Sequence, residues 1–146
     1  MNTIALRFAE NFAPEEGTIK AHEKLINENG FVWYGKRGAS LSKDAESMIL
    51  SAEDSKILLI QSGKTLRYWA HICEIQKEKP PKEHIPEYYR NRAEKFGTWF
   101  KVTLFEPAPK DILSKCKVTS SGTILSIASR QSMSPYFKIT YCEEED

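Results

Sequence analysis

The chain has 146 residues, of which 40% are hydrophobic and 28% are charged, which is the balance of one soluble globular domain. No apolar run approaches the ~20 residues that a membrane-spanning helix requires, and the first residues lack the layout of a signal peptide, so we expect a cytoplasmic protein without a membrane partner. The net charge of +1 is far from the strongly basic balance of many nucleic-acid binders.

Hydrophobic periodicity and turn residues predict the elements in the first half of the chain. Alternating apolar positions predict a strand over residues 4–8. A shared apolar face that ends in an Asn-Gly pair predicts a helix over residues 14–29. A short buried strand is expected at 31–34, followed by a basic, glycine-flanked loop at 35–38. Ser42 is the expected N-cap of a second helix.

The second half is predicted to contain longer strands. Two strands at 56–61 and 66–75 are joined by the short connection 62–64, which leaves no room for a crossover and makes them antiparallel neighbours. The further elements are a helical segment at 85–96, a strand at 99–106, a short helix at 109–116 and a final strand at 136–141. Five to seven strands, not in strict alternation with helices, predict an α+β fold, in which a curved mixed sheet or partial barrel is flanked by helices.

Charge is unevenly distributed along the chain. Residues 143–146 are all acidic, so residues 1–142 carry 21 basic and 16 acidic side chains, a net charge of +5. We therefore expect residues 1–142 to form a single domain and residues 143–146 to be an acidic tail or the start of a linker.

The sequence offers few groups for catalysis or metal binding. Cys73, Cys116 and Cys142 are odd in number and widely spaced, which argues against a disulfide framework and a zinc site. His71 and Cys73 share one strand face, and we interpret them as a buried, hydrogen-bonded histidine beside an apolar cysteine. No HExxH, GxSxG or phosphate-binding glycine loop is present. We expect a binding domain with no catalytic residue, metal or cofactor.

Three segments, in this order, resemble the PUA-like superfamily, closest to its EVE and YTH branches. They are residues 31–34 with the helix after Ser42, residues 57–75 with a glycine-containing turn, and Trp99–Val102 followed by residues 126–135. The chain lacks the opening usual in EVE and YTH domains, and a helix precedes Trp33. In this it is similar to the N-terminal target-recognition domains of McrB-like modification-dependent restriction factors.

The resemblance implies a module that binds nucleic acid and recognises a methylated base flipped into an aromatic pocket, with DNA slightly preferred over RNA. It also implies a larger motor or nuclease assembly as a partner. We expect the base pocket to be lined by Trp33, Tyr34, Trp69, Trp99, Ser129, Gln131 and Ser132. Basic side chains near these positions are expected to contact phosphates: Lys36, Arg37, Arg90, Arg92, Lys95 and Arg130.

Several alternatives stay open from the sequence. Trp33 could be a core residue instead of a pocket wall, and helical spacing favours a core role for Tyr88, Tyr89 and Phe96. The segment 129–132 could form a hydrogen-bonded turn instead of lining the pocket. The domain could also be an ASCH-like or otherwise diverged member that acts on a small molecule or nucleoside, or a protein-interaction module. Phosphate-driven binding would weaken with salt, whereas binding of a neutral small ligand would not.

Overall fold

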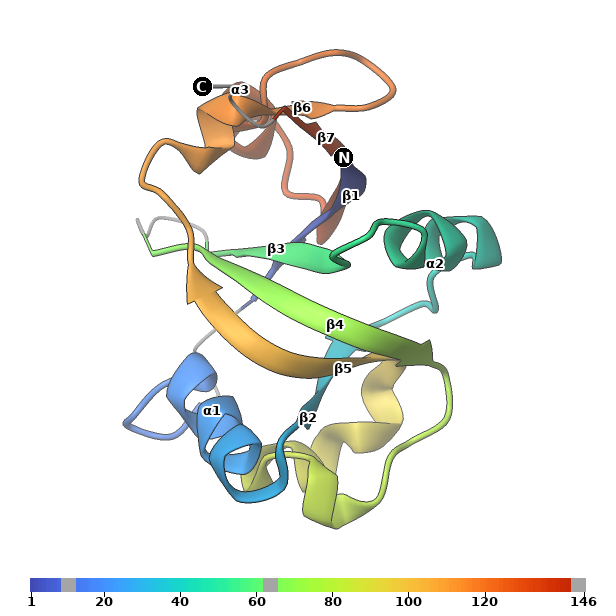
Figure 1. The fold of residues 1–146 in the computed structure, drawn as a ribbon, viewed down its shortest axis with the longest axis vertical. Helices are drawn as coiled ribbons and strands as arrows, with labels where there is room; N and C mark the ends of the chain where they lie inside the picture. The colour runs from blue at the N-terminus through green and yellow to red at the C-terminus, as the bar shows by residue number, and fades with distance from the viewer. Residues whose placement is uncertain (9–12, 62–65, 143–146) are drawn as a thin grey trace.

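The computed structural model describes residues 1–8, 13–61 and 66–142. Its elements, in chain order, are β1 (Asn2–Arg7), α1 (Thr18–Asn29), β2 (Val32–Arg37), α2 (Lys43–Leu50), β3 (Lys56–Ile60), β4 (Tyr68–Gln76), the 3-10 helices η1 (Lys82–His84) and η2 (Glu87–Lys95), β5 (Phe96–Pro107), the 3-10 helix η3 (Ile112–Lys115), β6 (Cys116–Val118), α3 (Leu125–Gln131) and β7 (Tyr136–Tyr141). Figure 1 shows how they are arranged.

The strands form one mixed seven-stranded sheet in the order β2-β5-β4-β3-β1-β7-β6. β1 and β3 are parallel, and the remaining neighbours are antiparallel. The prediction of an α+β fold with a mixed sheet is confirmed, as is the antiparallel pairing of β3 and β4, in which Lys56 lies opposite His71. The expected connection 62–64 and the acidic tail 143–146 fall outside the described residues.

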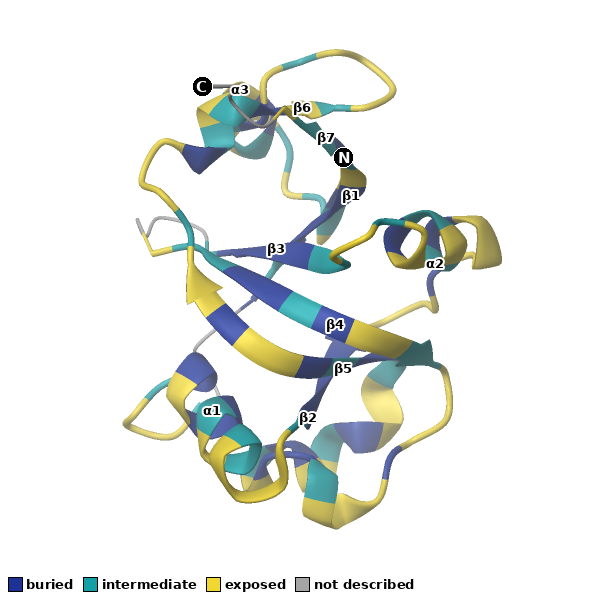
Figure 2. Cartoon of the chain, in the orientation of Figure 1, coloured by how far each residue is buried: buried dark blue, intermediate teal, exposed yellow. Residues whose placement is uncertain are grey.

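Burial on both faces of the sheet explains why several strands are continuous apolar runs. In β1, Ile4 and Leu6 face the main core beneath α1 and α2, whereas Ala5 faces a second cluster beneath η3 and α3. A third cluster lies between β2, β5 and η2. Burial is shown residue by residue in Figure 2, where the central strands are largely buried. No helix in the described part of the chain is long and apolar enough to cross a membrane.

Two local predictions need correction. Residues 35–37 continue β2 instead of forming a loop, because Gly35 pairs with Trp99 and Lys36 with Thr98 on β5. The segment expected to be a short helix through Cys116 ends one residue earlier, and Cys116 begins β6. The helix after Ser42 is confirmed, since the Ser42 side chain accepts a hydrogen bond from the Ala45 backbone N–H at 3.2 Å.

His22 is completely buried on the inner face of α1. Its Nδ1 donates to the Thr18 carbonyl oxygen at 2.8 Å, and its Nε2 has no hydrogen-bond partner among the described residues. Burial lowers the pKa of His22 from 6.5 to about 4, partly offset by the bond to Thr18. The folded protein therefore holds this side chain neutral near pH 7.

We expect His22 to make the domain sensitive to acid. Between pH 6.5 and pH 4, His22 is protonated in the unfolded chain but neutral in the folded chain. The free energy of unfolding therefore falls as the pH falls through this window. The loss attributable to His22 is about 3 kcal/mol below pH 4. Denaturant unfolding of wild type and His22→Phe across this range measures it. If the free energy of unfolding fell equally with pH in the two proteins, His22 would not be the source of the acid sensitivity.

Candidate nucleic-acid interface

Two of the tryptophans that the sequence indicated lie together. Trp33 on β2 and Trp99 on β5 belong to an aromatic cluster, which we define as Phe31, Trp33, Ile85, Tyr88, Tyr89, Ala93, Phe96 and Trp99. Ring centroids are 5.2 Å apart for Phe96 and Trp99, and 4.7 Å apart for Tyr89 and Phe96. Trp33 is 5% exposed and Trp99 is fully buried, so the cluster is filled by its own side chains in this structure.

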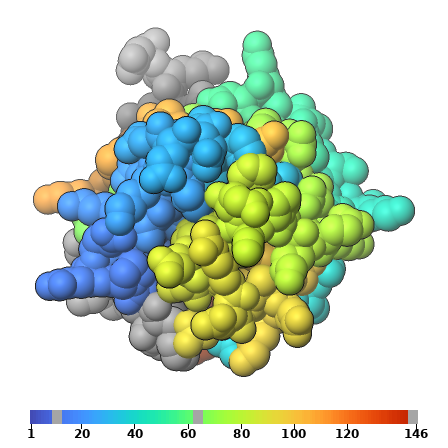
Figure 3. Space-filling view, turned by 90° about the horizontal axis from the view of Figure 1, so that it is seen from below, coloured from blue at the N-terminus to red at the C-terminus, as the bar shows by residue number. Residues whose placement is uncertain are grey.

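The nine-residue helix η2 closes this cluster from outside. Ile85, just before η2, and Tyr89 and Ala93 within it are buried. Of the three aromatic residues for which helical spacing favoured a core role, Tyr89 is buried, whereas Tyr88 and Phe96 are partly buried against the cluster. Seen from below, the segment from η1 to η2 covers the end of the molecule beside α1 (Figure 3). Helical periodicity was therefore a correct signal for burial, although the helix is of the 3-10 type.

Part of the expected phosphate-binding set lies at the rim of the aromatic cluster. The Gly38 backbone N–H donates to the Lys95 carbonyl oxygen at 3.0 Å, and Arg37 lies opposite Phe96 in the sheet. The end of β2 therefore lies beside the end of η2. Arg37 and Lys95, whose side chains are exposed, are on neighbouring stretches of backbone. Arg90 and Arg92 belong to the same helix η2.

Lys36 does not fit the phosphate-binding role that the sequence suggested. Its side chain is turned inward and is 5% exposed. The Nζ atom donates to the Ala39 carbonyl oxygen at 2.9 Å and lies 5.1 Å from the centre of the Tyr136 ring. Burial lowers the pKa of this amine. Lys36 belongs to β2 and not to the expected loop at 35–38, and the alternation of this strand directs its side chain toward the core.

The remaining aromatic candidates lie elsewhere. Tyr34 belongs to the main core, on the face opposite Trp33. Trp69 belongs to the second cluster, where its ring centroid is 5.2 Å from Tyr141 and the Lys56 Nζ lies 4.7 Å from its ring. Trp69 therefore does not join Trp33 and Trp99 in one pocket, and Tyr34 borders the aromatic cluster through Tyr89, whose ring centroid lies 6.3 Å away.

The segment 129–132 is organised by a residue that the sequence did not single out. The Arg7 guanidinium donates to the carbonyl oxygens of Ser129 at 2.6 Å, Ser132 at 2.8 Å and Ser134 at 2.9 Å. The Arg7 side chain thereby fixes the end of α3 to β1. No pattern in the sequence marks this role, because a basic residue at the end of a strand is usually solvated.

These bonds favour the turn role for the segment. The Arg130 Nε donates to the Ser126 carbonyl oxygen at 2.8 Å, within α3 itself. α3 packs on β6 and η3, at the edge of the sheet opposite β2 (Figure 1). The segment 129–132 therefore lies away from the aromatic cluster. The seven expected pocket residues do not line one pocket in this structure.

The interpretation of His71 and Cys73 as a buried pair is wrong about burial, whereas the expected hydrogen bonding of His71 is confirmed. Cys73 is exposed, and the two ring nitrogens of His71 lie 3.1 Å from an Asp54 carboxylate oxygen and 2.8 Å from a Glu106 carboxylate oxygen. The reason is the irregular register of β4 and β5, which shifts around Ile72. Across residues 1–8, 13–61 and 66–142, no group of three histidine, cysteine or acidic side chains could hold a metal ion.

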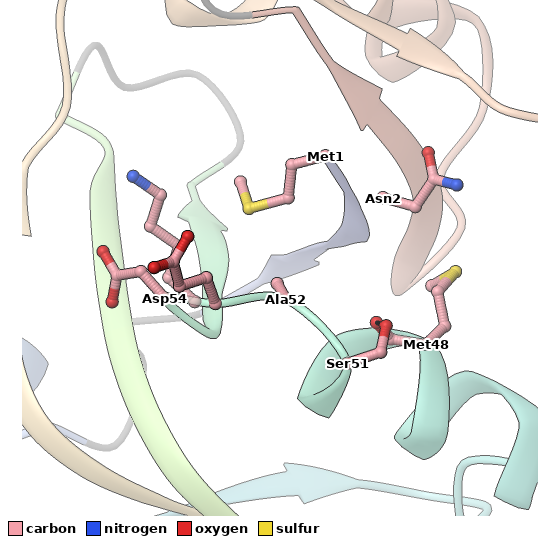
Figure 4. Close-up of a pocket in the computed structure, with 8 residues that line it drawn as sticks. Met1, Asn2, Met48, Ser51, Ala52 and Asp54 are labelled. Carbon is pink, nitrogen blue, oxygen red and sulfur yellow. Dashed lines mark hydrogen bonds between the residues drawn. The ribbon is translucent and has the colours of Figure 1, made fainter.

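A surface hollow of about 510 Å³ lies at the end of α2. Figure 4 shows it between the start of β1 and the loop that follows α2, with Met1, Met48 and Asp54 around it. Its lining contains none of the expected pocket residues. It includes the carboxylates of Glu53 and Asp54, which outnumber the single lysine, Lys56, and so do not favour a phosphate. The hollow is therefore distinct from the aromatic cluster.

Comparison with known proteins agrees with the fold. A model of the family described as Pua-like matches residues 4–145, which is nearly the whole chain. No curated protein and no solved structure matches the sequence significantly. The match spans β1 from Ile4 onward, all the later strands of the sheet and the residues that form the aromatic cluster. The chain therefore belongs to the PUA-like family.

Proposed function

We propose that this domain binds nucleic acid and recognises a methylated base that is extruded from the stack, with DNA slightly preferred over RNA. The observation that carries the proposal is the meeting of β2 and η2, which brings the backbone of Arg37 and that of Lys95 together beside Phe96 of the aromatic cluster. Cations hold phosphates without reading sequence, and flat apolar rings accept a methylated base. Membership of the PUA-like family supports nucleic acid as the ligand.

In this proposal Trp33 forms the wall against which the base stacks, and Trp99 borders the base beside it. Stacking contributes ~1–3 kcal/mol per base, whereas extruding the base costs a few kcal/mol. The phosphate contacts must supply the difference. We therefore propose that the isolated domain binds weakly and that a larger motor or nuclease assembly raises the affinity through avidity.

We also propose that the domain binds without catalysing a reaction. Burial raises the pKa of the Cys116 thiol to about 12, which keeps it protonated and a poor nucleophile. Cys73 and Cys142 are exposed free thiols. Incubation with nucleosides and oligonucleotides tests this part of the proposal, and turnover abolished by Cys73→Ser would contradict it.

Removing a rim cation should weaken binding regardless of base modification. We expect Arg37→Ala and Lys95→Ala each to weaken modified and unmodified strands alike. Each variant should also reduce the slope of log affinity against log salt by about 1, because one phosphate contact is lost. Fluorescence anisotropy with short labelled oligonucleotides, titrated at several salt concentrations, measures both quantities.

Arg130→Ala provides the matched control, because Arg130 is an exposed arginine on α3 at the other edge of the sheet. It should bind like the wild type. Loss of affinity in Arg130→Ala with no loss in Arg37→Ala would move the interface to α3 and overturn the proposal. Binding that does not change with salt would instead indicate a neutral small ligand.

A further inference from the structure

Two deeply buried polar atoms border the aromatic cluster without a hydrogen-bond partner among the described residues. They are the Nε1 of Trp99, which is an N–H donor, and the Nε2 of His22. Because the Nδ1 of His22 donates to the Thr18 carbonyl oxygen, the Nε2 atom of the neutral ring is an acceptor. Buried polar groups are normally satisfied, so one unpaired donor and one unpaired acceptor in the same region call for an explanation.

Tyr89 is the side chain that contacts both residues. Its ring centroid lies 5.0 Å from that of His22 and 6.1 Å from that of Trp99, in edge-to-face contacts with interplanar angles of 76° and 66°, and Tyr89 is 7% exposed. The Tyr89 hydroxyl forms hydrogen bonds with the Tyr34 and Tyr88 side chains. The ring is flat and of the size of a pyrimidine, but its edge offers nothing to Trp99 Nε1 or His22 Nε2.

The element that carries Tyr89 is unusual. η2 is a 3-10 helix of nine residues, whereas runs longer than three or four residues are uncommon because their hydrogen bonds are poorly aligned. Such a segment unwinds more readily than an α-helix of the same length. It is therefore suited to leave the cluster together with Tyr89.

We propose that Tyr89 occupies the place of the extruded base in the free protein, and that Trp99 Nε1 and His22 Nε2 read the edge of the base once η2 has moved aside. The proposal rests on the function proposed above. The pairing edges of adenine and cytosine each present a ring-nitrogen acceptor and an exocyclic N–H donor. A methylated amino group keeps one N–H, so either base, lying edge-to-face with Trp99 as Tyr89 does, would satisfy both buried atoms.

The test measures anisotropy of labelled single strands that carry one 5-methylcytosine, one N6-methyladenine or no modification. Tyr89→Phe loses the bonds to Tyr34 and Tyr88 but keeps the ring, so we expect roughly threefold tighter binding. Tyr89→Leu removes the competing ring and should bind roughly tenfold tighter. His22→Phe removes the acceptor and should bind roughly tenfold more weakly.

Tyr68→Phe on β4 is the matched control and should bind like the wild type. If the wild type binds but both Tyr89 variants bind equally or more weakly, Tyr89 is an ordinary core residue and this inference falls while the proposed function stands. Tighter binding by the Tyr89 variants without a loss in His22→Phe overturns the role of His22. If no variant binds any strand, the proposed function fails as well. Should Tyr89→Leu unfold, Tyr89→Phe decides the matter.

Discussion

Trp33→Ala is expected to lower the free energy of unfolding by about 3–5 kcal/mol. Trp33 is 5% exposed and packs within the aromatic cluster, so truncation removes a large apolar area and leaves a cavity between β2 and η2. For a domain of this size the melting temperature should fall by on the order of 10 °C. Thermal melts and oligonucleotide titrations on the same sample measure both consequences.

Met133→Ala is the matched control for this truncation. Met133 is a large apolar side chain that is 78% exposed, so its removal should change stability by no more than about 0.5 kcal/mol. A Trp33→Ala protein that melts like the wild type but no longer binds a modified strand would show that Trp33 lines an open pocket. That outcome would contradict the burial described above.

The coarse fold followed from periodicity because apolar spacing reports local burial. The face formed by Ile19, His22 and Leu25 predicted α1, and the short connection after residue 61 predicted the antiparallel pairing of β3 with β4. β6 and α3 were missed. β6 has only three residues and α3 only seven, too few for a hydrophobic period to stand out.

The site was harder to predict than the fold, since it depends on contacts between distant segments. The pairing of β2 with β5 brings Trp33 and Trp99 together, and no local pattern specifies that register. Trp69, like Trp99, is a tryptophan in a predicted strand, but its side chain packs in the second cluster. A basic residue such as Lys36 is expected at the surface by its type alone, whereas the alternation of β2 turns it inward.

Gly97 has a role that only the tertiary structure reveals. It lies at the start of β5 beneath residues 38–40, where a Cβ atom would overlap the Gly38 carbonyl oxygen and lie 2.8 Å from the Ser40 backbone nitrogen. Both neighbours are backbone atoms and cannot rotate away. The same crossing is held by hydrogen bonds from the Ser40 hydroxyl to the Gly97 carbonyl oxygen at 2.6 Å and from the Leu41 N–H to the Thr98 hydroxyl at 2.9 Å.

We therefore expect Gly97→Ala to destabilise the domain by about 4 kcal/mol, of which up to about 3 come from overpacking and about 1 from a hydrogen bond lost as the strands separate. Gly30→Ala is the control, because a Cβ atom at Gly30 meets nothing within 4 Å and only its φ of +88° is unfavourable. That variant should lose about 1–2 kcal/mol. Denaturant unfolding of both variants separates steric overlap from backbone strain. Equal losses of stability in the two variants would mean that residues 38–40 move away from β5 at little cost in free energy. The rim of the aromatic cluster, with Arg37 and Lys95, would then be adaptable rather than fixed.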